Sequence, residues 1–118
     1  MGIDLYKIQP SEPYLCEEAV EFFCKNIKKI FKYEPQIDIV SYNGIFQNKY
    51  VVVEGHHRLF ACHRRGIVEI PLKPRQIKRE EIPLIKKRVK ITQQKGIRTI
   101  RDLEGHLLPD FVCAILKS

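Results

Sequence analysis

The sequence contains no tryptophan and only one methionine, and none of its apolar runs approaches the roughly 20 residues that cross a bilayer. Residues 1–10 also lack the apolar core of a secretory signal peptide. There is no internal repeat and no low-complexity segment, which argues against repeat arrays and disordered chains. Together with a composition of 44% hydrophobic and 30% charged residues over 118 positions, these features predict one folded, cytoplasmic domain with no membrane partner.

No two cysteines form a Cys-x-x-Cys pair. The chain has four of them, Cys16, Cys24, Cys62 and Cys113. Because cytoplasmic thiols are kept reduced, we expect no disulfide, and Cys24 and Cys113 lie in apolar segments typical of core thiols. A zinc site built from Cys62 and the neighbouring histidines is an alternative, although the spacing fits no standard zinc finger.

Positive charge is concentrated in the second half of the chain. Residues 1–54 hold 6 Lys/Arg against 8 Asp/Glu, a net charge of −2. Residues 55–118 hold 15 against 6, a net charge of +9. Such a basic half suggests a polyanionic partner or a phosphate-bearing ligand, and a solvated basic surface is the alternative.

Hydrophobic periodicity predicts a small α/β or α+β domain with a mixed sheet flanked by helices. We expect strands at 3–8, 37–42, 50–53 and 68–72, and helices at 14–31 and 57–65. The strand core then spans about 3–75 of the single domain 1–118, and 76–118 is a helical extension. In that extension we expect helices at 98–108 and 109–117, and either a helix at 80–90 or a strand at 87–91.

Two local features of the first half carry further predictions. Helical spacing places Phe22 and Phe23 on one apolar face of the helix at 14–31, so both are expected in the core. Asn43-Gly44 is a turn signal that predicts a hairpin into the strand at 50–53.

The most informative stretch is residues 50–71, where an apolar strand meets a helix through a polar cluster. That cluster is Glu54, Gly55, His56, His57 and Arg58. A helix start presents unpaired backbone N–H groups and a positive dipole, glycine allows a close backbone approach, and arginine offers a planar donor fork. The pattern predicts phosphate binding by Gly55, His56, His57 and Arg58. Alternatively, Glu54 pairs with Arg58 and the histidines cap the helix.

This stretch resembles the ParB/sulfiredoxin superfamily, whose signature is a strand ending in Gly-x-x-Arg, then a helix and a strand closing with Ile-Pro. Gly55, Arg58 and Ile70-Pro71 match those positions, and the resemblance covers roughly residues 5–75. The Glu-Gly-His-His-Arg variant is most similar to the Asp-Gly-His-His-Arg of ADP-dependent free-serine kinases. Sulfiredoxins carry their nucleophilic cysteine where His56 stands, so the resemblance does not imply sulfinic acid reduction.

The kinase resemblance implies ADP or ATP as the nucleotide, with CTP as the partition-protein alternative, and Mg²⁺. It implies a small hydroxylated substrate such as serine. Glu12 matches a catalytic glutamate that follows a proline in those kinases, so Glu12, Glu54 and His57 are the candidate catalytic residues, with Glu54 as a ligand to Mg²⁺. Leu107-Leu108-Pro109 corresponds to a segment that approaches the nucleotide in those kinases.

The alternative reading is a ParB-like module that binds DNA, or acts as a nuclease, without turning over a small molecule. Its candidate nucleic-acid contacts are the basic residues Arg64, Arg65, Lys73 and Arg75. No aromatic residues are interleaved with them, so stacking of single-stranded bases is not predicted.

Overall fold

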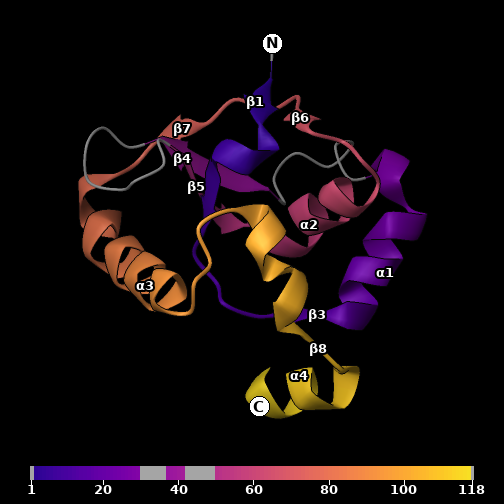
Figure 1. The fold of residues 1–118 in the computed structure, drawn as a ribbon. Coiled ribbons are helices and arrows are strands. Elements are labelled where there is room, and N and C mark those ends of the chain that lie inside the picture. Colours follow the sequence, from indigo (N-terminus) through magenta and orange to yellow (C-terminus); the bar gives the residue numbers. More distant parts are fainter. Residues whose placement is uncertain (1, 30–36, 42–49, 118) are drawn as a thin grey trace.

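The computed structural model describes residues 2–29, 37–41 and 50–117 (Figure 1). Its strands are β1 (Ile3–Asp4), β2 (Ile8–Pro10), β3 (Leu15–Cys16), β4 (Asp38–Ser41), β5 (Tyr50–Glu54), β6 (Glu69–Ile70), β7 (Arg75–Gln76) and β8 (Leu107–Leu108). Its α-helices are α1 (Glu17–Lys25), α2 (His56–Arg64), α3 (Ile82–Gln94) and α4 (Asp110–Lys117). Short 3-10 helices are η1 (Leu5–Lys7), η2 (Ile27–Lys29), η4 (Arg79–Glu81) and η5 (Ile100–His106). This is the small α+β domain with mixed sheet predicted above.

The central sheet has four strands in the order β2-β5-β4-β7. β5 pairs in parallel with β2 and antiparallel with β4, and β4 pairs in parallel with β7. The antiparallel pairing of β4 with β5 confirms that these two strands are neighbours, while the expected turn at Asn43-Gly44 lies outside the described residues. Two small strand pairs, β1-β6 and β3-β8, tie the chain ends to the body of the domain.

The sheet is buried on both faces, which explains the uninterrupted valines of β5. Val52 belongs to the core cluster shared with α1 and α2, whereas Val51 belongs to a second cluster with Ile85 and Val89 of α3. Successive strand residues point to opposite faces, so a strand covered on both sides reads as a continuous apolar run. Figure 1 shows α3 on one side of the sheet and α1 and α2 on the other.

The segment from α3 to η5 contributes Ile85, Val89, Ile97, Ile100 and Leu103 to the core. The segment around position 85 is a helix, and the alternative of a strand at 87–91 is wrong. Pro83 lies in the first turn of α3. Backbone N–H groups in the first turn make no hydrogen bond within the helix, so proline, which lacks this group, is tolerated there. The helix expected at 98–108 is instead the 3-10 segment η5, of which Ile100 and Leu103 are fully buried.

The first helix is shorter than the periodicity predicts, since α1 ends at Lys25 and η2 follows. Phe23 packs against the core, but Phe22 is 59% exposed, so its predicted burial is wrong. Phe22 contacts the Phe23 ring edge-on at 5.3 Å between centroids. Within the described ranges, no helix is long and apolar enough to span a membrane.

Candidate functional site

Gly55 makes the turn that carries β5 into α2. Its φ of 98° and ψ of 22° lie in the left-handed region, which side chains with a Cβ avoid. The chain therefore turns tightly at this glycine, and α2 begins directly after it at His56. The backbone N–H groups at the start of α2 and its positive dipole end are thus presented beside the carboxyl end of β5.

His56 points into the protein, where its ring is 2% exposed. Its Nε2 accepts the backbone N–H of Ser11 at 3.0 Å. Because a backbone N–H can only donate, the single proton of the neutral ring is on Nδ1. Nδ1 in turn lies 3.7 Å from Oε2 of Glu12. His56 therefore fixes the loop between β2 and β3 from the inside, a role that the sequence pattern did not suggest.

The neutrality of His56 follows from its surroundings. Its pKa is lowered to about 3, chiefly by burial and to a smaller extent by electrostatic interactions with His57 and Arg88. The Glu12 carboxylate does not offset this, because its side chain is 43% exposed and its charge is screened by water. At neutral pH His56 is thus neutral, and the nitrogen that carries its proton faces Glu12 at 3.7 Å.

His57 makes the second contact between the start of α2 and the same loop. Its Nε2 accepts the backbone N–H of Cys16 at 3.0 Å, and its ring is half-buried. The two histidines of the motif therefore bind two backbone N–H groups five residues apart, at Ser11 and Cys16. This pairing holds the loop that carries Glu12 against the first turn of α2.

Arg58 stacks on an aromatic ring. Its guanidinium carbon lies 4.4 Å from the centroid of Phe23 in α1. Burial lowers the pKa of Arg58 from its usual value, but that value is so high that the group stays charged. Stacking uses the face of the guanidinium, whereas its N–H donors lie in the plane of the group. Phe23 thus holds the guanidinium of Arg58 against α1.

Glu12 and His57 meet in one pocket, which has a volume of about 190 Å³. Its lining residues are Glu12, Pro13, Tyr14, Leu15, Cys16, His57, Leu108 and Cys113. The residues that the sequence predicted as catalytic are therefore brought together in part, with Leu108 of the Leu-Pro segment beside them. A pocket of this size is smaller than the roughly 300–1,000 Å³ of sites for drug-sized ligands, so it suits a small molecule.

Glu54 is not among the residues that line this pocket. It ends β5 on the surface, opposite Asp38 of β4 in the strand register. Across the described ranges, no three His, Cys, Asp or Glu side chains are grouped as a metal site. Cys62, the cysteine of the alternative zinc site, lies in the core, where burial raises the pKa of its thiol to about 12. Zinc binds the thiolate form, which this pKa disfavours.

The candidate nucleic-acid contacts are spread over different parts of the surface. Arg64 donates to Glu104 at 3.3 Å, and Arg65 donates to the carbonyl of Cys24 at 3.3 Å. Lys73 is exposed in the segment between β6 and β7. The structure does not gather these side chains into one patch with Arg75.

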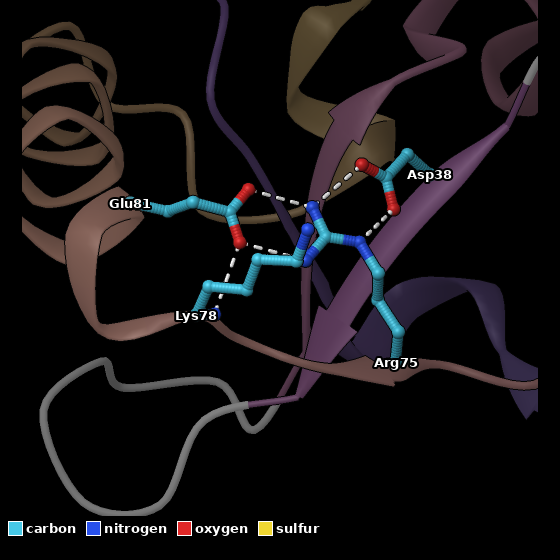
Figure 2. A network of polar contacts seen from close by, with 4 residues as sticks. All are labelled: Asp38, Arg75, Lys78 and Glu81. Atoms are coloured by element: carbon cyan, nitrogen blue, oxygen red, sulfur yellow. Dashed lines mark hydrogen bonds and ion pairs between the residues drawn. The ribbon is translucent and has the colours of Figure 1, made fainter.

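Arg75 holds two carboxylates at once, as Figure 2 shows. Its Nε and Nη2 donate to Asp38 at 2.7 and 2.8 Å, and its Nη1 and Nη2 donate to Glu81 at 2.7 Å each. These bonds lower the pKa of Glu81 to about 2 and raise the pKa of Arg75. The guanidinium joins β4, β7 and η4, so Arg75 acts as a structural clamp in this conformation.

A disulfide joins Cys16 to Cys113, 97 residues apart in the sequence. Its Cα atoms are 5.9 Å apart, and it connects β3 to α4. The expectation that the chain has no disulfide is therefore wrong, and Cys113 is buried as a half-cystine rather than as a core thiol. No spacing rule could identify the pair, because only the fold brings these two positions together.

Comparison with known proteins supports the fold. No protein-family model and no curated protein matches the chain. The structure is similar to the crystal structure of protein Atu1540 from Agrobacterium tumefaciens, with a TM-score of 0.56 and 16% sequence identity. The match covers 88% of this chain and 60% of that one, which is less than two thirds of the neighbour's length. At this identity the likeness concerns the fold alone.

Proposed function

We propose that this protein is a nucleotide-dependent phosphotransferase that acts on a small hydroxylated substrate, similar to the free-serine kinases of the ParB/sulfiredoxin superfamily. One observation carries the proposal: Glu12 and His57, from separate segments, line a single small pocket at the start of α2. A carboxylate next to an anion-favouring helix start is the arrangement that phosphoryl transfer to a hydroxyl requires.

The nucleotide phosphates would bind at the first turn of α2. The Gly55 turn brings the backbone close to a ligand, and the helix N-terminus favours negative charge. Arg58, held against α1 by Phe23, would donate to phosphate oxygens from the edge of its guanidinium. We assign ADP or ATP to this position, with CTP as the alternative nucleotide.

Glu12 would be the general base in the adjacent pocket. It would accept the proton of the substrate hydroxyl while that oxygen attacks the terminal phosphorus of the nucleotide. The bond from that phosphorus to the bridging oxygen would break, and the nucleotide shortened by one phosphate would leave with the bond's electron pair. His56 and His57 would act by position, because they fix the loop that carries Glu12. The volume of about 190 Å³ supports a substrate of the size of serine.

Mg²⁺ would enter with the nucleotide. Proteins commonly bind it through one or two carboxylates plus substrate phosphates, and the exposed Glu54 at the end of β5 is such a carboxylate. When bound, the ion neutralises charge on the phosphates. The donor set fits this mode better than a protein cage, because the described residues contain no group of three metal-ligand side chains.

Phosphorus NMR of the protein with each nucleotide and a panel of small alcohols, serine included, tests this function. We expect a new phosphomonoester signal that depends on the protein. Glu12→Gln should lower the rate by about 10²–10⁴-fold and leave nucleotide affinity nearly unchanged. Glu17→Gln is the control, because Glu17 is an exposed carboxylate on α1 outside the pocket. Equal rates in the two variants would contradict the assignment of Glu12.

Nucleic-acid binding is a second candidate, supported by a run of exposed cations on α3. These are Lys86, Lys87, Arg88 and Lys90. They face solvent in the half of the chain that carries a net charge of +9. Fluorescence anisotropy with duplex DNA should then show affinity that falls steeply with salt and weakens in Lys87→Glu.

A further inference from the structure

The disulfide joins two segments that otherwise touch over a small area. β3 and β8 pair through only two residues each, and α4 follows β8 at the edge of the molecule (Figure 1). Cys16 and Cys113 are 9% and 5% exposed, so the bond is buried between these segments. The covalent link is therefore placed where the C-terminal helix meets the first half of the chain.

α4 exposes much of its described apolar surface to solvent. Of its described large apolar side chains, Phe111 and Ile115 are 69% and 67% exposed. Among its described side chains only Cys113 is buried, and Val112 is half-buried. A helix of eight residues is also too short to be stable by itself in water. Among the described side chains of α4, the half-cystine Cys113 is therefore the one anchored in the interior of the protein.

The same bond forms part of the wall of the candidate substrate pocket. Both half-cystines line that pocket together with Glu12 and His57. The backbone N–H of Cys16 also donates to Nε2 of His57, so a shift of β3 would break or lengthen this hydrogen bond at the start of α2. The oxidation state of one bond and the shape of the pocket are therefore physically connected.

We propose that Cys16–Cys113 is a redox latch that closes the pocket when oxidised and releases α4 when reduced. The proposal rests on the proposed function only in taking this pocket as the substrate site. The reductant is a dithiol: one of its thiolates attacks one sulfur of the bond and its second thiolate resolves the mixed disulfide. Two electrons and two protons pass to Cys16 and Cys113 as thiols, and the donor becomes a disulfide.

Release of α4 removes Cys113 from the pocket wall and opens the pocket to solvent. The oxidised protein then holds a small substrate against Glu12, and the reduced protein binds it more weakly. Cys24 and Cys62 are already free thiols, so a reductant has no bond to break at either of them.

Amide hydrogen exchange of the oxidised and the dithiothreitol-reduced protein tests the latch without any ligand. We expect exchange of residues 108–117 and of the Cys16 amide to speed up by about tenfold or more on reduction, with the amides of Val51 and Val52 unchanged. The Cys16→Ser/Cys113→Ser double variant should exchange like the reduced protein and ignore reductant. Cys24→Ser, which keeps the disulfide, should behave like wild type.

Three outcomes would overturn the latch. The first is exchange that is the same in both redox states. The second is loss of protection throughout β5 on reduction, which would make the bond a staple for the whole fold. The third is peptide mapping of the oxidised protein without a Cys16–Cys113 pair. A latch that opens as expected in a protein that transfers no phosphoryl group would leave the latch standing and contradict the proposed function alone.

Discussion

The Nδ1 atom of His56 lies 3.7 Å from Oε2 of Glu12, across the loop that follows β2. His56 is buried and Glu12 is half-exposed, so the histidine approaches the carboxylate from the protein interior. This relationship links the helix-start motif to a residue 44 positions earlier in the chain. It connects the loop that carries Glu12 to the first residue of α2.

The first prediction concerns pH. Folded His56 has a pKa of about 3, well below the ordinary 6.5. Between these two pH values the unfolded chain binds a proton at His56 and the folded protein does not. Stability should therefore be complete above pH 6.5 and fall as the pH drops towards 3, with a limiting slope of about 1.4 kcal/mol per pH unit from this group.

Urea unfolding between pH 7 and pH 5 measures this slope, because carboxylates contribute least in that range. His56→Gln keeps an acceptor for the Ser11 N–H but does not titrate, so the difference between wild type and variant isolates His56. A difference that does not change with pH would contradict the buried, neutral histidine.

The second prediction concerns the turn at Gly55. Its φ of 98° is unfavourable for any residue with a Cβ, so Gly55→Ala should destabilise the protein by about 1–2 kcal/mol. It should also weaken nucleotide binding, because the backbone at the start of α2 shifts. Gly105→Ala is the control, since a Cβ there meets nothing within 4 Å and its φ is not positive. Chemical denaturation measures the free energy of unfolding of both variants. Equal losses in Gly55→Ala and Gly105→Ala would contradict the prediction.

The third prediction concerns the Arg75 clamp. Arg75→Met leaves Asp38 and Glu81 side by side without their shared cation, so we expect a loss of about 1–3 kcal/mol in the free energy of unfolding. Arg75→Lys should recover only part of it, because an ammonium cannot make four directed bonds to two carboxylates. Arg79→Met, at an exposed site in η4, should be nearly neutral. Full recovery by lysine would show that charge alone matters.

The sheet and its helices could be predicted because their signals are local. The β-branched run of β5, the glycine turn and the amphipathic α2 each follow from neighbouring residues. The antiparallel β4-β5 pairing is the one expected of a hairpin, which the Asn43-Gly44 turn signal predicts. The predicted burial of Phe22 is wrong because helical periodicity identifies the apolar face of a helix but not how much of that face the core covers. α1 ends before its apolar stripe does.

The candidate site was predictable only in part, because it is assembled from distant segments. Gly55, His57 and Arg58 could be singled out from one motif, and Glu12 from a resemblance. The contacts of His56 with Ser11, and of Cys16 with Cys113, join residues 45 and 97 positions apart and depend on the fold. Arg75 likewise looked like a surface cation, since its two partners lie on β4 and η4.

Nucleotide binding at the start of α2 is the central claim, and calorimetry with ADP, ATP and CTP, each with Mg²⁺, tests it most directly. We predict that at least one of them binds wild type with micromolar affinity and binds Arg58→Ala at least about tenfold more weakly. Phe23→Leu removes the stacking partner but keeps the guanidinium, and should lose less; Arg65→Ala, at the far end of α2, should bind like wild type. No binding of any of the three nucleotides, or equal binding by wild type and Arg58→Ala, would contradict the phosphate site.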